Sequence, residues 1–329
     1  MEFAPAIYEH AAKLIGKTPW EVSRDEELLF HAHAAAFRTY HHRPVVVGID
    51  IYNLEAEAYG AVVDQPDGHG IPAVSRHPCG SAAEVLQLAP FDPSRHGRIP
   101  MFIRVARLLA DTFPEADVRV PVSGSFSVAS NLMGFEDLLC EVLSDPDSIR
   151  RALSHLVEGQ LGFCRAIRAR GIGATLFESA ATPPMLSPDA FASVELPALR
   201  ALIAGASTIF GKPIACVMGG NTYPILDSLL STGVGYVICP PETDQKAFLD
   251  KLRDHPQVAV RMSMAPQVIA AGNMEEIRRE VDRLLALIGD RKNASIGAGI
   301  IPYETDPAVV LKTAEYVRSV KGKRKITGE

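Results

Sequence analysis

The sequence predicts a single-domain α/β protein, a (β/α)8 TIM barrel with an N-terminal helical extension. Three observations support this class: repeated apolar runs rich in β-branched residues, capped helical segments between them, and a length of 329 residues. A barrel of this kind takes about 250 residues and tolerates additions. Alternating strands and helices indicate parallel strands covered by helices, although the pattern alone is also compatible with a doubly wound sheet.

The predicted strands begin at residue 44 with the run PVVVGIDIYN, which has the composition of a buried parallel strand. Residues 60–100 hold many turn formers and predict an inserted hairpin and loop. Helix-capping residues lie between most of the runs, at Asp145, Ser187, Asn221, Asp244 and Asp306. The further predicted strands are 118–124, 174–179, 213–219, 235–240, 258–264 and 294–300.

The predicted organisation has three parts. Residues 1–43 form a helical lead-in, with a short helix over 5–16 and a second helix that opens at a capping box, Ser23 to Glu26. Residues 44–320 form the barrel. Residues 321–329 form a basic tail, which we expect to be a loose, solvated end.

Composition excludes several classes of function. Charged residues make up 22% of the chain and the formal net charge is -6, so a nucleic-acid partner is not expected. The sequence contains no apolar run of 18 residues, so a membrane span is not expected. Its first residues lack a basic region followed by an apolar stretch, so a signal peptide is not expected either. The five cysteines are widely spaced and odd in number, which favours reduced thiols in a cytoplasmic protein.

Active sites of such barrels lie at the carboxyl ends of the strands, which gives a list of candidates without any motif. Asp50 and Glu178 each end an apolar strand, where an unpaired carboxylate is costly, so both are candidate catalytic groups. Ser179, Glu242 and Ser263 are also polar residues at strand ends or in the following loops. The further candidates chosen from such positions are Tyr52, Asn53, Ser125, Asn221, Cys239, Arg261, Tyr303 and Glu304.

Several candidates also have a purely structural interpretation. Asn221 is placed to cap a helix, and Cys239 is equally a buried structural thiol. His77 and Cys79 form an H-x-C pair that supplies two zinc ligands at most, and no close third partner is visible. Together with Glu178 and Cys239 they are the weak candidates for a metal site.

Four segments in the second half of the chain have a characteristic order and spacing. They are ESAATPPMLSPDAFASVELPALRALI, PIACVMGGNTYPILDSLLSTGVGYV, VAVRMSMAPQVIAAGNMEEIRREV and GAGIIPYETDPAVVLKTAEYV. In this order and spacing the chain resembles the uroporphyrinogen decarboxylase-like superfamily, clearly over residues 170–318 and loosely over 44–170. The resemblance points to the corrinoid-dependent methyltransferase branch of that superfamily.

Two departures from the family pattern narrow the expected chemistry. The arginine-rich segment like R-Q-A-G-R-Y that the decarboxylase uses is absent, so decarboxylation of a tetrapyrrole is not expected. The zinc ligands of the thiol-methylating members fall at Val217, Gly219 and Ala298, which offer no ligand. Cys216 is one residue out of phase, so we expect it to point away from the barrel centre.

The resemblance therefore implies a methyltransferase that moves a methyl group from a small methylated substrate to the cobalt of a separate corrinoid (cobalamin) protein. In that hypothesis Asp50 or Glu178 donates a proton to the leaving group, with Tyr303 as a further catalytic candidate. Tyr52, Asn53 and Tyr303 hold the substrate. The other substrate-binding candidates are Ser125, Asn221, Cys239, Arg261 and Glu304.

Two alternatives remain open at this point. A decarboxylase-like lyase acting on a carboxylated small molecule requires several arginines in the pocket, and only Arg261 ends a strand. A non-catalytic binding protein built on the barrel would also suit the missing zinc ligands. The sequence identifies neither the methyl donor nor the assembly, for which a homodimer is one candidate.

Overall fold

The computed structural model describes residues 2–324 of the chain. Residues 325–329, part of the predicted basic tail, lie outside the described residues. The preceding backbone, up to Arg324, belongs to the last helix, α16 (Pro307–Arg324).

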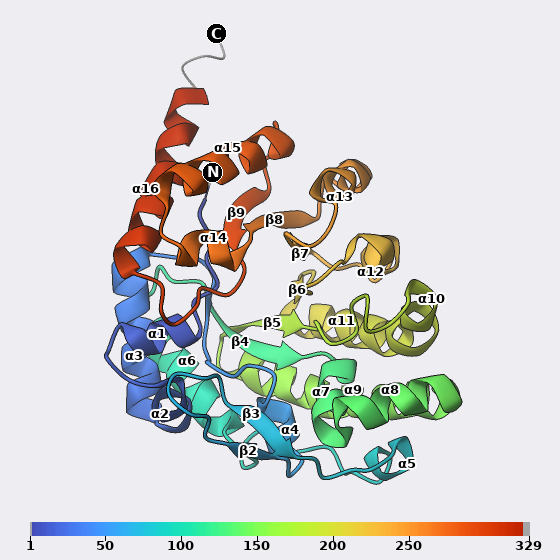
Figure 1. The fold of residues 1–329 in the computed structure, drawn as a ribbon. Helices are drawn as coiled ribbons and strands as arrows, with labels where there is room; N and C mark the ends of the chain where they lie inside the picture. Colours follow the sequence, from blue (N-terminus) through green and yellow to red (C-terminus); the bar gives the residue numbers. More distant parts are fainter. Residues whose placement is uncertain (1, 325–329) are drawn as a thin grey trace.

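All seven predicted runs form strands, and every pairing among them is parallel. They make two hydrogen-bonded sheets, in the orders β1-β4-β5-β6 and β7-β8-β9. A parallel bridge from Ala215 to Tyr236 joins the two sheets into one curved array, which the helices surround (Figure 1). The strands are β1 (Val45–Val46), β4 (Val118–Ser123), β5 (Gly173–Phe177), β6 (Cys216–Val217), β7 (Tyr236–Cys239), β8 (Ala259–Met264) and β9 (Ala294–Ala298).

The start of the chain extends this array, which the sequence did not predict. Phe3 and Ala6 form parallel bridges to Ile296 and Ile300, so residues 3–6 lie beside β9 instead of in a helix. In the described part of the chain no backbone hydrogen bond joins residues 3–6 to β1. The structure is thus an α/β fold with a curved parallel sheet, and among the described residues the backbone pairing does not close this sheet into a complete (β/α)8 barrel.

Three helices follow this extended segment, and their caps differ from the prediction. The predicted capping box between Ser23 and Glu26 is wrong. Asp25 caps α3 with its own side chain, and Thr18 and Glu21 form a capping box one helix earlier, on α2. The helices are α1 (Glu9–Lys13), α2 (Pro19–Arg24) and α3 (Glu26–Tyr40).

The inserted hairpin predicted within residues 60–100 is present. Its antiparallel strands are β2 (Val62–Asp64) and β3 (Ala73–Arg76), at one side of the molecule in Figure 1. The helices around it are α4 (Leu54–Ala58), α5 (Ala82–Val85) and α6 (Ile99–Thr112).

The covering helices start largely where the sequence indicates. Asp145, Ser187 and Asp244 accept from backbone amides of the helices that they precede. Asn221 does not cap, because Thr222 precedes the 3-10 helix there. The helices not yet named are α7 (Ser125–Met133), α8 (Phe135–Ser144), α9 (Pro146–Ala169), α10 (Pro188–Ala190), η1 (Phe191–Glu195), α11 (Leu196–Phe210), η2 (Tyr223–Ile225), α12 (Leu226–Leu230), α13 (Gln245–Lys251), η3 (Leu252–Asp254), α14 (Pro266–Ala270) and α15 (Met274–Ile288).

One continuous helical stretch, Pro188–Phe210, is long and apolar enough to cross a membrane by length and composition alone. It packs against α9 and buries Leu199 and Leu202 completely. Core helices of globular proteins meet the same criterion, so this stretch is weak evidence for a membrane span.

A buried carboxyl group ties α4 to the end of β4. Glu55 Oε1 accepts from the Ser123 amide at 2.7 Å, and Oε2 accepts from the Ser123 hydroxyl at 3.0 Å. Glu55 is completely buried, and this burial raises its pKa to about 7, against the hydrogen bonds from Ser123. The folded protein therefore prefers the protonated form of this group.

This preference makes stability depend on pH. A pKa raised on folding stabilises fully below its unfolded value of 4.5, and the contribution is lost as pH rises through about 7. A shift of this size corresponds to about 3 kcal/mol. Glu55→Gln should reduce the fall in unfolding free energy between pH 4.5 and 8, measured by urea denaturation. The exposed Glu158→Gln is the control; equal pH slopes in wild type and Glu55→Gln would contradict the assignment.

Candidate active site

A cavity of 260 Å³ lies at the carboxyl ends of the parallel strands. Its walls come from the start of the chain, from β5 to β8, and from the loops after β1, β7 and β9. Glu242 and Ile300 are exposed and mark where it meets solvent. The residues that line the cavity include Ala6, Tyr8, Ile51, Tyr52, Phe177, Ser179, Val217, Gly219, Ile238, Glu242, Arg261, Ser263 and Ile300.

The alternation of side chains along a strand decides which candidates reach the cavity. Phe177 and Ser179 line it, whereas Glu178 between them faces the helices outside the sheet. In the same way Val217 lines the cavity and Cys216 does not, which agrees with the predicted orientation of Cys216. Each strand thus contributes every second residue.

A chain of hydrogen bonds between Tyr52 and Ser179 crosses the cavity wall. The Tyr52 hydroxyl donates to Ser179 Oγ at 2.8 Å, and the Gly219 amide donates to the same oxygen at 2.9 Å. A serine oxygen has two acceptor positions, and both are used. The hydroxyl proton of Ser179 is therefore left to donate to a ligand. Burial raises the pKa of Tyr52 above its ordinary value, so Tyr52 stays a donor.

The cationic group of the cavity is Arg261 on β8. The residue is only 8% exposed, and one terminal nitrogen donates to the Ala4 carbonyl at 3.4 Å. The predicted substrate-binding residues Tyr52 and Arg261 thus both line the cavity.

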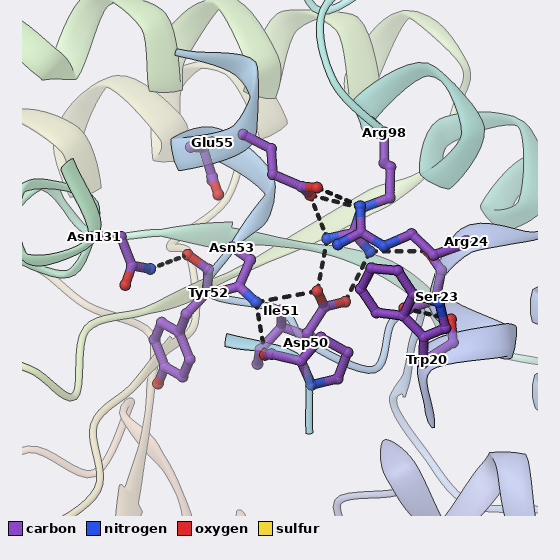
Figure 2. Close-up of polar contacts among 12 residues, drawn as sticks. Trp20, Ser23, Arg24, Asp50, Ile51, Tyr52, Asn53, Glu55, Arg98 and Asn131 are labelled. Carbon is purple, nitrogen blue, oxygen red and sulfur yellow. Dashed lines mark hydrogen bonds and ion pairs between the residues drawn. The ribbon is translucent and has the colours of Figure 1, made fainter. Parts of the chain in front are cut away.

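Asp50, predicted as a catalytic acid, does not line the cavity and is committed to an ion pair (Figure 2). Its carboxylate accepts from both terminal nitrogens of Arg98, at 2.8 and 2.7 Å. The Arg98 Nε also donates to Glu57 at 2.6 Å, and Arg24 contacts the same carboxylate. Burial alone would lower the pKa of Arg98, but Asp50 and Glu57 raise it above its ordinary value. Asp50 is therefore committed to the ion pair with Arg98 and does not face a ligand in the cavity.

The Asp50 pair fixes the loop that carries Tyr52. The Asn53 amide donates to Asp50 at 3.1 Å and to the Pro72 carbonyl at 2.8 Å, which also holds the hairpin. Asn131 on α7 donates to the Tyr52 carbonyl at 2.8 Å, as Figure 2 shows. Asn53, predicted to bind substrate, is a buried positioning residue outside the cavity.

Glu178, the second predicted acid, belongs to a buried carboxyl pair outside the sheet. Its oxygens accept from the Phe126 and Ser127 amides at 3.1 Å and from the Ser127 hydroxyl at 2.5 Å. Burial raises the pKa of Glu178 to about 7. Burial, followed by the neighbouring Glu178, raises that of Glu195 well above its ordinary value. Because Glu178 receives the donors, Glu195 is the member that keeps the proton.

Three further predicted binding residues also serve the scaffold. The Ser125 hydroxyl on α7 donates to the side-chain oxygen of Gln160 on α9 at 2.8 Å. Asn221 accepts from Thr243 at 3.0 Å. Cys239 is a completely buried thiol whose pKa burial raises, so the structural interpretation of this residue holds. None of the three lines the cavity.

Tyr303 and Glu304 hold the hairpin to the loop after β9. The Tyr303 ring stacks on His69 at 4.1 Å, and its hydroxyl donates to the Lys17 carbonyl at 3.1 Å. Glu304 lies 3.0 Å from His69 Nδ1. Neither residue lines the cavity, so Tyr303 is not placed for catalysis there.

The weak metal candidates do not come together. His77 contacts the Asn131 carbonyl at 2.8 Å and is exposed, while Cys79 is buried. Between residues 2 and 324 no group of three or more His, Cys, Asp or Glu side chains is arranged to hold a metal ion. Val217 and Gly219 do line the cavity, but neither they nor Ala298 offer a zinc ligand.

Sequence reasoning missed several residues that shape the site. Ser179 and Ser263 were visible as polar strand ends, and the period-two pattern would have separated Ser179 from Glu178. Arg98 and Glu195 gave no signal, because each lies on a helix or helix start far from its carboxylate partner in sequence. Tyr8 was missed because a helix was predicted over residues 5–16.

Comparison with known proteins identifies a family and a fold. The sequence profile of the family described as uroporphyrinogen decarboxylase (URO-D) matches residues 4–320. No curated protein matches the sequence. A methyltransferase from Methanosarcina mazei superimposes with a TM-score of 0.81 at 18% identity, covering 98% of this chain and 95% of that one. A putative vitamin-B12 independent methionine synthase from Listeria monocytogenes gives a TM-score of 0.53 at 11% identity, covering 100% and 97%.

The ion pair behind the cavity predicts a large effect of one substitution. Arg98→Met leaves Asp50 and Glu57 buried without this guanidinium, so the unfolding free energy should fall by about 3–5 kcal/mol. Urea denaturation measures the change. The control is Arg104→Met, which breaks the exposed pair with Glu26 and should cost about 0–1 kcal/mol. Similar losses of unfolding free energy in Arg98→Met and Arg104→Met would contradict this prediction.

Proposed function

The chain belongs to the uroporphyrinogen decarboxylase family, and from this premise we propose that it transfers a methyl group from a small methylated substrate to the cobalt of a separate corrinoid protein. The observation that carries the proposal is the cavity at the carboxyl strand ends, which combines apolar walls with a hydroxyl donor at Ser179. The fold shared with a methyltransferase supports the same branch of the family.

The size of the cavity supports a division of labour between two proteins. A volume of 260 Å³ suits a small molecule, because cavities for drug-sized ligands measure about 300–1,000 Å³. A corrin ring is larger than such ligands, so it would meet the substrate at the mouth, between Glu242 and Ile300. The partner's reduced corrinoid supplies the nucleophile for the methyl carbon.

The residues of this chain would bind the substrate and stabilise the leaving group. Apolar walls from Ile51, Phe177 and Ile238 exclude water from the substrate body. As the methyl–oxygen bond breaks, negative charge develops on the oxygen of the leaving group. The Ser179 hydroxyl, oriented by Tyr52 and the Gly219 amide, would donate to that oxygen. This assigns to Ser179 the role that the sequence suggested for Asp50, Glu178 or Tyr303.

The proposed reaction does not pass through zinc. The residues at the family's ligand positions, Val217, Gly219 and Ala298, do not fit a zinc ion. A cytoplasmic location belongs to the same proposal and agrees with five free cysteines, since thiols stay reduced there.

An optical assay with a reduced corrinoid carrier protein tests the proposal. Methoxylated aromatics, methylamines and halomethanes serve as candidate donors, and methylation of the cobalt is followed by absorbance. With a methoxylated donor, Ser179→Ala should lower the rate by about 100-fold and Tyr52→Phe by about tenfold, because the leaving oxygen loses its donor. With a halomethane, whose halide needs no proton, both variants should change the rate much less.

Matched surface variants control for nonspecific loss. Ser154→Ala alters an exposed residue of α9, and Tyr316→Phe alters a half-buried residue of α16 outside the cavity, so both should leave the rate unchanged. Absence of methylation with every donor would overturn the proposal. If a small acid nevertheless bound tightly, a lyase acting on a carboxylated molecule or a binding protein would replace it.

A further inference from the structure

Two buried donors without partners lie on the same face of β8. The Nε of Arg261 and the hydroxyl of Ser263 have no hydrogen-bond partner in the described part of the protein. Both residues line the cavity, and they are two positions apart on one strand, so their side chains point to the same side. Buried polar groups are normally paired, so two neighbouring unpaired donors indicate a ligand that accepts from both.

The protein provides a fitted slot for the Arg261 side chain. Gly297 on β9 lies against its stem: a Cβ at this glycine would come within 2.6 Å of Arg261 Cδ and of the Ala4 carbonyl. The glycine and the extended segment at residues 3–6 therefore make room for the arginine. Its guanidinium is held in the cavity wall next to Tyr8. Burial raises the pKa of Tyr8, and the charge of Arg261 lowers it in part.

The charge of Arg261 is not balanced within the described residues. No carboxylate there lies within 4.0 Å of its guanidinium. The acidic residue that lines the cavity is Glu242, which is exposed at the mouth. Arg98, by contrast, has a side chain that is 10% exposed and is paired with Asp50 and Glu57. A buried, unpaired guanidinium is costly, and an anionic ligand removes that cost.

We propose that Arg261 and Ser263 bind the carboxylate of a small monocarboxylic acid. A carboxylate matches the geometry of the guanidinium and has enough acceptor positions for the serine hydroxyl as well. This inference rests on the proposed function, because it names the chemical class of the substrate that occupies the same cavity.

The strand register relates the carboxylate site to the strand that carries Ser179. Phe177 pairs with Val217, and Ile238 pairs with Arg261, with the bridge at Ala215 and Tyr236 linking the two sheets. Arg261 and Ser263 therefore correspond in register to Phe177 and Ser179. The carboxylate site on β8 and the Ser179 hydroxyl after β5 thus come from separate strands that line the same cavity.

Equilibrium binding tests this assignment without any corrinoid protein. The probes are 4-methoxybenzoate and its uncharged counterpart 4-methoxybenzamide, measured by isothermal titration calorimetry and by the shift in Tm. We expect the acid to bind at least about tenfold more tightly than the amide. Arg261→Met should remove this preference, Arg261→Lys should weaken it, and Ser263→Ala should reduce it to a lesser degree.

Controls separate binding from folding. Arg253→Met removes an arginine that is 79% exposed and should leave the preference intact. Because no described carboxylate pairs with Arg261, its replacement leaves no acidic side chain without a partner. Without ligand, the Tm of Arg261→Met should therefore be no lower than that of wild type. Should it unfold earlier, Ser263→Ala still tests the site. Equal affinity for acid and amide, or an unchanged preference in both Arg261→Met and Ser263→Ala, would overturn the inference.

The inference and the proposed function fail separately. If a carboxylate binds through Arg261 but no corrinoid is methylated, the anion site is supported and the proposed methyl transfer is contradicted. Methylation from a carboxylated methoxy donor such as 4-methoxybenzoate at a rate unaffected by Arg261→Met, together with equal affinity for acid and amide, would do the reverse.

Discussion

The alternation of side chains along parallel strands is the constraint on which the site depends. Each strand sends every second residue inward, so neighbours such as Phe177, Glu178 and Ser179 have opposite surroundings. The inward set makes a small cavity with hydroxyl groups and one guanidinium. The outward set meets helices, and its charged members need partners from those helices. The residues that line the cavity and the residues that hold the helices therefore come from the same strands but are different residues.

Support is concentrated behind the first strand, where four charged side chains meet. Asp50, Glu57, Arg24 and Arg98 connect α2, α4, the end of β1 and the start of α6. Their mutual pairing holds the loop from which Ile51 and Tyr52 enter the cavity. A buried ion pair contributes little net stability but is sensitive to the loss of one partner, which suits a group that fixes geometry. Asp50 matters for the site in this indirect way.

The sequence was sufficient for the strands and for most helix starts, because burial and capping leave local patterns. All seven predicted strands and the inserted hairpin are present, and Tyr52 and Arg261 reach the cavity. Asp50 and Glu178 were misplaced because an acid at a strand end looks the same whether it faces a ligand or a helix. Only the position of Arg98, 48 residues from Asp50, and of Glu195 beside Glu178 distinguishes the two cases. The extended start of the chain was also beyond local reasoning, since its partner strand is nearly 300 residues away.

That pairing of the first residues with β9 has a consequence for how the protein is made. The Ala4 amide donates to the carbonyl of Ile296, and the Ala4 carbonyl accepts from Arg261. During synthesis from the N-terminus, residues 3–6 emerge nearly 300 residues before their hydrogen-bonding partner. Domains generally fold as units, and contacts of such long sequence separation are slow to form. The wall of the cavity that holds Arg261 is therefore completed only after translation of the last strand, so a nascent or truncated chain lacking β9 would be without a ligand site.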